Sequence, residues 1–598
     1  MLKSTDGNNK VMNMTKRKGT LLRKKYGEYL LATLAMSASL FLAAIVDNIM
    51  VGNFLGADAL AALNLTFPIV YIKNIVFCIF IYGGNTLAAI YKGKRDNNSA
   101  NKSFTFSVLF GVVASTLMVI LGIAFARPTA MALSQGGPLF DLTLEYTIPL
   151  WVSGPFVLFN SGIATYVRND GMKKLAIALP VVSNAINLAL DYVYMALFGW
   201  GVAGAGWATV SGYAIGSLLL VFYFTSKHRT VKFVRVGIHD IKLFLSVLKT
   251  GLPMALSQAC NVVRTCFINA IILSAAGTVG MQIISICMSA FNIAMIFISG
   301  SSTTLMPICG ALYGERDNKG VHYVLRFSLI ITEIMCIAVL VVYELFPLYV
   351  GRLFAPVPPE TAVQLELAIR IFSLCIPFYG ISYNINAFYQ CTKQSFAASL
   401  FTVLEGVVFI VPMIYLFALI STEMMWLSFT LAEIAALLVT VVAMQIIARK
   451  KQRTSFLMLD SSAEQGVLDM TIENRQDSAV EASKAVEKFC IENEIDSGVA
   501  NILAVTAEEL AVNAAKYAYK GKNDIDICLR ILEDDVVLSF RDNGVNFNPT
   551  EYMDDSGEII TGLSLVRSIT PDISYNRVLG FNVTVVKIKK SNNVSSTI

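Results

Sequence analysis

Residues 41–68 read FLAAIVDNIMVGNFLGADALAALNLTFP, and this stretch decides the class of fold. Apolar residues fill it, and Asp47 is the one charge in its first half. Together with the apolar residues from position 27 onward, it exceeds the ~20 residues that a helix needs to cross a bilayer. Because an ionisable group inside lipid is energetically costly, Asp47 is a candidate functional residue.

The same apolar character continues to residue 447. Of the 598 residues, 55% are hydrophobic and 15% are charged, whereas about a quarter of an ordinary globular domain is charged. Short polar loops divide the region into twelve segments: 27–49, 59–91, 104–126, 143–168, 174–196, 200–225, 243–273, 277–312, 324–350, 361–391, 396–420 and 424–447. The sequence therefore predicts an all-α polytopic membrane protein with twelve helices.

Basic residues mark one side of this predicted bundle. Lys and Arg gather in the N-terminal tail 1–26 and in loops such as 227–249 and 449–453, while loops 50–58 and 274–280 lack them. By the positive-inside rule both termini face the cytoplasm, which requires an even number of crossings. We expect a multi-pass protein of the plasma (inner) membrane of a prokaryote. The net charge of +5 then reports topology, and we expect no nucleic-acid partner.

The predicted membrane region repeats itself. YKGKRD at 91–96 is matched by LYGERD at 312–317, and Pro155 is matched by Pro377, at shifts of 221 and 222 residues. Six helices followed by six more predict two lobes related by an axis along the membrane normal. Two such lobes imply a cleft between them and transport by alternating access.

Polar side chains within the apolar segments predict a cation site. Asp191 follows Asn187 by four residues, so a carboxylate and an amide share one helical face. Asp47 could complete the oxygen cage, which would suit either a sodium ion or a proton held on a carboxylate. The alternative is that Asp47 or Asp191 pairs with Lys73 or caps a broken helix.

Several stretches resemble one transporter family. They are FLAAIVDNIMVGNFLGADALAALNLTFP, RNDGMKKLA, SNAINLALDYVYM, GVAGAGWATVSGY, TGLPMALSQ and LYGERD. They look like the multidrug and toxic compound extrusion (MATE) transporters over residues 27–447. The resemblance implies a V-shaped antiporter that exports organic, often cationic, compounds in exchange for Na⁺ or H⁺. It implies a cation-coupling site on Asp47, Asn187 and Asp191, with Thr209 as a fourth ligand.

The resemblance also bears on the second lobe. Some members carry acids on helices 7 and 10, where this chain offers the amides Gln258, Asn384 and Asn386. We treat these three as candidate substrate contacts. Glu405 is a further candidate for contact with substrate, and an interlobe hydrogen bond is its alternative role.

A different kind of sequence follows Arg453. Two amphipathic helices near 478–492 and 498–519 precede strands near 525–532 and 535–541. A short helix from 562 and strands near 572–577 and 582–589 come after them. With VLDMTI upstream, this pattern predicts an α+β sandwich. The chain contains no G-x-x-x-x-G-K-[ST] loop, so the sequence encodes no P-loop motor.

The tail carries the elements of another nucleotide site. Glu509 and Asn513 share a helical face and could supply a base and a magnesium ligand, with Lys516 in reach of phosphates. Asp542 in DNGVNFNP could accept the adenine amino proton, and Gly544 lets the backbone approach a purine. Gly562, at the start of a helix, offers free N–H groups to phosphates.

These motifs resemble the Bergerat-fold ATPases that histidine kinases share with anti-sigma factor serine kinases. The resemblance covers 477–590 and implies ATP and Mg²⁺, with Glu509 as catalytic base, Asn513 on the metal and Asp542 on adenine. It places Gly544 and Gly562 beside the nucleotide. Asn546 and Ser564 stand where the family has glycines, and the lid at 550–561 is short, which leaves reduced affinity or absent hydrolysis open. No histidine lies in the tail, which argues against a histidine autokinase.

Three hypotheses follow for the whole chain. The first is a cation-coupled exporter of organic compounds with an ATP-binding regulatory tail, which a cytoplasmic regulatory protein could contact. The second is a membrane-tethered serine/threonine kinase or anti-sigma-like binding module with the transporter half as sensor, and the third is a flippase for lipid-linked substrates. The predicted domains are a basic tail 1–26, an N-lobe 27–226, an inter-lobe loop 227–242, a C-lobe 243–448, a linker 449–466 and the ATP-binding domain 467–590.

Overall fold

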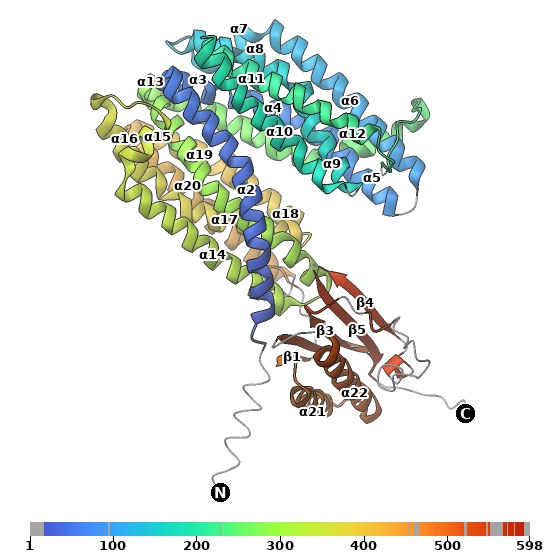
Figure 1. Ribbon diagram of the computed structural model, residues 1–598. Coiled ribbons are helices and arrows are strands. Elements are labelled where there is room, and N and C mark those ends of the chain that lie inside the picture. Colours follow the sequence, from blue (N-terminus) through green and yellow to red (C-terminus); the bar gives the residue numbers. More distant parts are fainter. Residues whose placement is uncertain are drawn as a thin grey trace. The chain divides into compact units, whose positions relative to one another are not determined.

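The computed structural model describes residues 17–93, 96–170, 172–227, 229–451, 453, 455–459, 466–518, 523–545, 548–550, 566–567, 569–570, 572–578 and 580–590. The chain forms two compact units (Figure 1). The membrane unit comprises residues 32–302 and 329–443. The terminal unit comprises 1–31, 303–328 and 444–598.

The first half of the chain is helical. Its α-helices are α2 (Thr20–Leu55), α3 (Ala57–Leu65), α4 (Phe67–Phe77), α5 (Gly83–Gly93), α6 (Asn97–Ala124), α7 (Ala126–Ser134), α8 (Phe140–Val157), α9 (Ile163–Asn169), α10 (Lys173–Asp191), α11 (Gly201–Gly216) and α12 (Leu220–Phe224). Three π-helical segments, η1 (Cys78–Tyr82), η2 (Leu158–Gly162) and η3 (Tyr192–Leu197), and the 3₁₀ turn η4 (Ser217–Leu219) join some of these helices. Such π segments are rare and are frequent at functional sites.

The second half repeats the helical pattern. Its elements are η5 (Ile238–Asp240), α13 (Ile241–Gly314), α14 (Asn318–Leu345), α15 (Pro347–Phe354), α16 (Pro359–Ser373), α17 (Cys375–Cys391), α18 (Ser395–Val403), the π segment η6 (Leu404–Phe409), α19 (Ile410–Ile420), η7 (Met424–Trp426) and α20 (Leu427–Lys450). Within α13 the helix breaks at Gly277, whose φ of 62° is costly for residues with a Cβ.

Eleven helices of the described residues are long and apolar enough to cross a membrane. One of them, Met254–Gly314, is 61 residues long, about three times the ~20 residues of one crossing. The break at Gly277 divides it into two helices, which agrees with the predicted segments 243–273 and 277–312. The twelve-helix membrane fold is thereby confirmed. Several bounds differ by five to seven residues: α2 begins at Thr20 rather than at residue 27, α6 begins at Asn97 rather than at 104, and α14 begins at Asn318 rather than at 324.

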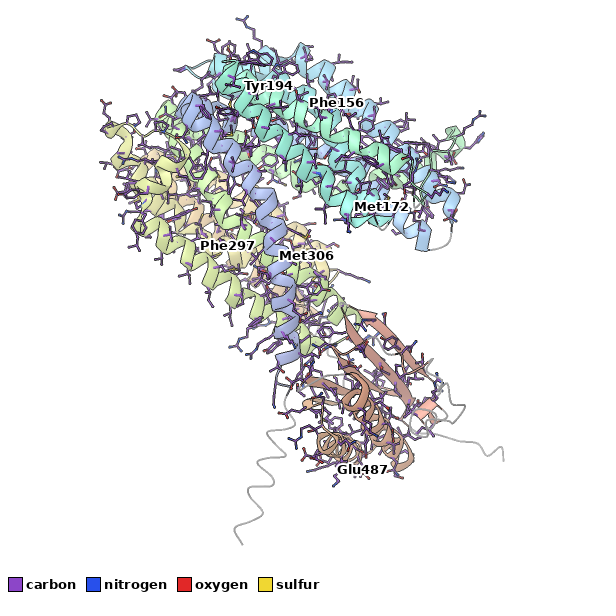
Figure 2. All side chains as sticks on the ribbon, in the orientation of Figure 1. Phe156, Met172, Tyr194, Phe297, Met306 and Glu487 are labelled. Carbon is purple, nitrogen blue, oxygen red and sulfur yellow. The ribbon has the colours of Figure 1, made fainter. Side chains whose placement is uncertain are left out.

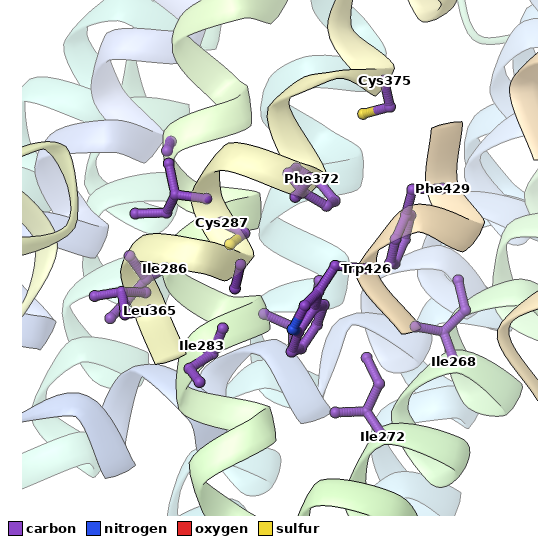
Figure 3. Packing of buried hydrophobic residues seen from close by; sticks show 14 of the residues in the cluster. Ile268, Ile272, Ile283, Ile286, Cys287, Leu365, Phe372, Cys375, Trp426 and Phe429 are labelled. Atoms are coloured by element: carbon purple, nitrogen blue, oxygen red, sulfur yellow. The ribbon is translucent and has the colours of Figure 1, made fainter. Parts of the chain in front are cut away.

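Apolar packing holds the membrane unit together. Trp426 and Phe429 lie beside Ile268 and Ile272 of α13 in one buried cluster that also takes in Phe372 (Figure 3). Other large apolar side chains face outward: Leu218, Leu419 and Ile420 are between 66% and 72% exposed. Side chains such as Tyr194 and Phe297 can be followed on their helices in Figure 2. An exposed apolar surface of this kind fits a lipid environment.

The terminal unit contains a five-stranded antiparallel sheet in the order β1-β2-β3-β5-β4. The strands are β1 (Gly466–Glu473), β2 (Asp524–Ile531), β3 (Asp535–Asp542), β4 (Ile573–Val578) and β5 (Phe581–Lys589), and the helices are α21 (Gln476–Glu492), α22 (Ser497–Asn513) and the π segment η8 (Ala514–Ala518). Each predicted strand lies within one residue of its observed bounds. The predicted helix 498–519 instead ends its α-helical part at Asn513.

The sheet has two chemically different faces. Side chains alternate along each strand, and Leu538 and Phe540 of β3 pack with α21 and α22 in one apolar core, together with Ile527 of β2. The opposite face carries charged side chains, among them Arg530 and Arg541, and these are buried as well. Since charges are seldom buried without partners, the second face requires contacts of its own.

Candidate functional site

The first candidate site lies in the first half of the membrane unit. Asp47 comes from α2, Asn187 and Asp191 from the end of α10, and Thr209 from α11. Helices α10 and α11 approach closely because Gly212 has no Cβ: a Cβ there would lie 2.7 Å from that of Asn187. The π segment η3 begins directly after Asp191.

Hydrogen bonds connect three of these four residues. Asn187 Nδ2 donates to Asp191 Oδ2 at 3.2 Å and lies 3.5 Å from Thr209 Oγ1. The carboxyl groups of Asp47 and Asp191 lie close enough to interact electrostatically. One oxygen of each, Oδ1, is buried without a hydrogen-bond partner among the described residues. The structure therefore brings all four predicted residues together.

Two facing carboxylates repel one another unless a proton or a cation lies between them. Lys73 does not supply that charge, because its ammonium group donates to Leu150 O and Ser153 Oγ, both at 2.8 Å. No ion pair between Lys73 and an acid is found in the part of the chain that the structure describes. The buried oxygens of Asp47 and Asp191, with the oxygens of Asn187 and Thr209, are chemically suited to Na⁺ or to a shared proton.

A cavity of about 440 Å³ opens beside this group. Asp47, Asn187 and Thr209 line it together with Tyr146 and Tyr213. Sequence reasoning missed these two tyrosines. Tyr146 is remote in sequence from the four residues, and no spacing rule connects them. Tyr213 follows Thr209 by four residues on α11, so the periodicity of a helix could have identified it.

A second cavity, of about 530 Å³, is lined by helices from both halves of the membrane unit. Its charged lining residues are Asp47, Arg264, Glu405 and Glu433, and aromatic rings such as Tyr379 complete the wall. Glu405 lies in the π segment η6 and lines this cavity, and its role as a substrate contact stays a prediction. An apolar and aromatic cavity with a few charges is a typical site for a small organic molecule.

The three predicted amides are not among the lining residues of either cavity. Asn384 donates to Thr332 Oγ1 at 3.1 Å, and Asn386 donates to Thr402 Oγ1 at 3.2 Å. Gln258 Oε1 is buried. Their role as substrate contacts stays a prediction.

The third candidate site lies on the helix-covered face of the sheet in the terminal unit. Asn513 is buried and donates through Nδ2 to Glu509 O at 2.7 Å, so its side-chain oxygen is available to a metal. Glu509 lies one turn earlier on α22. Lys516 is exposed in η8. Asp542 ends β3, the strand against which α22 packs.

Asp542 is held firmly in place. It is 6% exposed, and its Oδ1 accepts hydrogen bonds from Gly544 N at 2.8 Å and from Asn582 Nδ2 at 2.9 Å. Asn582 is a residue that sequence reasoning missed, and the pairing of β3 with β5 puts it opposite Asp542. Gly562, Asn546, Ser564 and the lid from residue 551 onward lie outside the described residues.

Comparison with known proteins decides the family. The MatE family model matches residues 32–193 and 253–416, more than half of the chain. The chain belongs to the MatE family. Residues 472–590 of this MatE protein match a second family model, the histidine kinase-like ATPase domain. Both resemblances noted in the sequence are thereby confirmed.

Individual relatives agree with this assignment. The multidrug export protein MepA of Staphylococcus saprophyticus is 21% identical over 401 residues, which cover 66% of this MatE protein and 88% of the relative. MepA of Staphylococcus haemolyticus is also 21% identical, over 62% of this chain and 81% of its own.

Solved structures share the fold of the membrane region. An inward-facing MATE family transporter of the MOP superfamily matches with a TM-score of 0.63 at 22% identity, over 71% of this chain and 99% of its own. An outward-facing MATE family transporter matches with a TM-score of 0.58 at 20% identity, over 74% of this chain and 99% of its own.

Proposed function

We propose that this protein is an antiporter that exports organic, drug-like cations in exchange for Na⁺ or H⁺, and that its terminal domain binds ATP to regulate export. The observation that carries the proposal is the buried carboxylate pair of Asp47 and Asp191, which needs a cation or a proton between its members. The relatives named as multidrug export proteins support the export of organic compounds.

The two cavities suggest how exchange works. Asp47 lines both the smaller cavity beside Asn187 and the larger one beside Glu405. A coupling ion at Asp47 and Asp191 and a cationic substrate in the larger cavity therefore compete for negative charge at Asp47. Such competition is the basis of exchange, since loading one cation weakens binding of the other. When one monovalent cation is exchanged for another, no net charge crosses the membrane, so the concentration gradient of the coupling ion supplies the free energy for export.

The coupling is tested with the purified full chain in proteoliposomes that contain a fluorescent organic cation. A Na⁺ gradient and a proton gradient are imposed separately and then together. We expect one of them to drive transport and the same ion to compete with the organic cation at equilibrium. A transport rate that is the same with and without either gradient would overturn the antiport proposal and favour the flippase.

The topology belongs to the same proposal. The basic loops support a topology in which both termini and the ATP-binding domain lie in the cytoplasm of a prokaryotic cell, where ATP is abundant. A C-terminal reporter that is active only outside the plasma membrane should stay silent. Activity of that reporter would mean that the number of crossings is odd.

ATP binding is tested by calorimetry on the full chain with Mg²⁺-ATP. Asn513→Ala should weaken binding that depends on Mg²⁺, and Asp542→Ala should reduce the preference for adenine over guanine. Deleting residues 455–598 should leave export driven by the gradient intact, because the carboxylate pair lies outside that region. Loss of all export in a correctly inserted deletion variant would show that the ATP-binding domain is required for transport.

A second function is favoured by the position of Glu509, which lies one helical turn before Asn513 and is only half buried. A carboxylate beside the expected metal site could act as general base toward a serine of a partner protein. Phosphorylation of a bacterial protein by the full chain, lost in Glu509→Gln, would support the kinase function.

A further inference from the structure

The charged face of the sheet in the terminal unit has a partner within the same chain. This polar face consists of Asp469, Thr471, Asp526, Arg530, Ser539 and Arg541, each less than 10% exposed. Its partners are residues 17–20 at the N-terminus and the α13–α14 loop, residues 315–317, which belongs to the LYGERD motif. All of these residues lie in the terminal unit.

The α13–α14 loop contacts the polar face through its two acids, Glu315 and Asp317. Asp317 Oδ2 accepts from Arg541 Nη1 at 3.1 Å and from Arg17 Nη1 at 2.7 Å. Glu315 pairs with the second amino group of Arg541, and its backbone carbonyl accepts from Arg530 Nη1 at 2.7 Å. The loop is therefore held by side chains of β2, β3 and the N-terminal segment at once.

The N-terminal segment, residues 17–20, also binds the polar face. Arg17 Nε donates to Asp526 Oδ2 at 3.0 Å, and the backbone N–H of Lys18 donates to Thr471 Oγ1 at 3.0 Å. Asp317 is buried, which opposes its ionisation, but Arg17 and Arg541 outweigh burial and hold the pKa of Asp317 well below its usual range. The loop acid is thus a fixed negative charge between two arginines.

Strand β3 also reaches the nucleotide site, from its other face, together with its neighbour β5. On β3 the loop-binding Arg541 precedes Asp542, the predicted acceptor of the adenine amino group. On β5 Phe581, which lies under the guanidinium of Arg541, precedes Asn582, which donates to Asp542 Oδ1. Neighbouring residues of a strand point to opposite faces, so one strand end serves both sites.

We propose that the α13–α14 loop is the structural partner of the ATP-binding domain and that its docking on the polar face preorganises the nucleotide site. This inference rests on the proposed ATP binding. A loop that fixes Arg541 also fixes the adjacent Asp542 and lowers the ordering cost of binding adenine. By reciprocity, nucleotide binding strengthens docking of the loop. The presence or absence of bound nucleotide therefore changes how tightly the junction of α13 and α14 is held.

The test compares Asp317→Asn with Asp96→Asn, the matched change in the repeated loop YKGKRD, using the full chain in lipid nanodiscs. We expect Asp317→Asn to weaken Mg²⁺-ATP binding about 10-fold, within the 5- to 150-fold range of typical couplings, and Asp96→Asn to leave it unchanged. Hydrogen exchange at residues 312–325 should be slowed by Mg²⁺-ATP in the unaltered chain and accelerated by Asp317→Asn without nucleotide.

Each outcome is decisive. Equal ATP affinity in the unaltered chain and in Asp317→Asn, with faster exchange of the loop in the variant, would overturn the coupling and leave the proposed function standing. No ATP binding by the unaltered chain would overturn both, and the exchange difference between the two chains would still report the docking. If Asp317→Asn fails to fold, Glu315→Gln tests the same coupling. It removes one contact to Arg541 and should weaken ATP binding by a smaller factor.

Discussion

The two halves of the membrane region share a loop motif but use it differently. In YKGKRD, Asp96 caps α6 by accepting from Ser99 N at 3.0 Å, and it is partly exposed. In LYGERD, Asp317 makes the equivalent contact with Gly320 N at 2.8 Å but is buried beneath Arg17 and Arg541. The first half also holds the facing carboxylates. A repeated scaffold therefore carries the proposed ion site in one half and a docked loop motif in the other.

The two loops differ in the charge of the residue two positions before the capping aspartate. Lys94 in the first motif corresponds to Glu315 in the second, where Glu315 pairs with Arg541. A lysine at position 315 would place a positive charge against two arginines of the polar face. The capping aspartate is thus common to both loops, while the neighbouring acid, which complements the arginines of the polar face, is present in the second loop alone.

The largest effect is expected at the ion site of the first half. Asp191→Asn should reduce gradient-driven export to the level of empty vesicles, because an amide cannot carry the charge that balances a cation. Asp47→Asn should do the same. The measurement is efflux in proteoliposomes, with Asp141→Asn, an exposed acid at the start of α8, as control. Export at the unaltered rate in both variants would remove the coupling role from the first half.

The next effect separates the two loops by stability. Asp317→Asn should destabilise docking by about 2–3 kcal/mol, because it removes the acid that Arg17 and Arg541 share while each arginine keeps one other acid. Asp96→Asn, the matched change, should cost about 1 kcal/mol or less, since asparagine also caps helices. Hydrogen exchange in increasing urea measures both, at the sheet amides for Asp317→Asn and at the first amides of α6 for Asp96→Asn. Equal losses would mean that the two loops are equivalent after all.

A smaller effect is expected in the cavity that both halves line. Glu405→Gln should weaken binding of an organic cation about 10-fold, or ~1.4 kcal/mol, and leave the dependence on the coupling ion unchanged. The reason is that Glu405 lines the larger cavity and is absent from the lining of the smaller one. Glu423→Gln, at an exposed acid before η7, is the control. A changed ion dependence would place coupling in the second half as well.

The smallest effect concerns a single acid of the polar face. Burial raises the pKa of Asp469 to about 6, and the charges that surround it are Arg17, Asp317, Lys319 and Asp526. Since the pKa is raised on folding from its usual 3.8 to about 6, Asp469 costs stability, and this cost is largest above pH 6, shrinks as the pH falls from 6 to 3.8, and is absent below pH 3.8. Asp469→Asn should therefore stabilise the terminal unit by about 1 kcal/mol at pH 8, less than the ~3 kcal/mol that two pKa units represent. The gain should fall to about half at pH 5, because unfolded Asp469 is still ionised there, and thermal melts at the two pH values would show this.

Much of this arrangement was predictable from the sequence. Apolar segment length gave the twelve helices, and the i, i+4 spacing of Asn187 and Asp191 placed two ligands on one face. The alternation of Val536, Leu538 and Phe540 gave the core face of β3. Long-range partners could not be predicted in this way: Tyr146 at the ion site and Asn582 at Asp542 are set by the packing of distant helices and by strand order. The sequence also gave no sign that Asp317 would meet Arg541.

The contact between Arg17 and Asp526 joins residues 509 positions apart. At 5–20 residues per second, a ribosome needs roughly half a minute to two minutes to make the intervening chain, so this ion pair can close only when synthesis is almost complete. It also requires both ends of the chain on one side of the bilayer. A chain with one helix left out would leave Arg17 and Asp526 separated by the membrane and the polar face uncovered. The ion pair thus reports, within the folded molecule, that insertion has been completed with an even number of crossings.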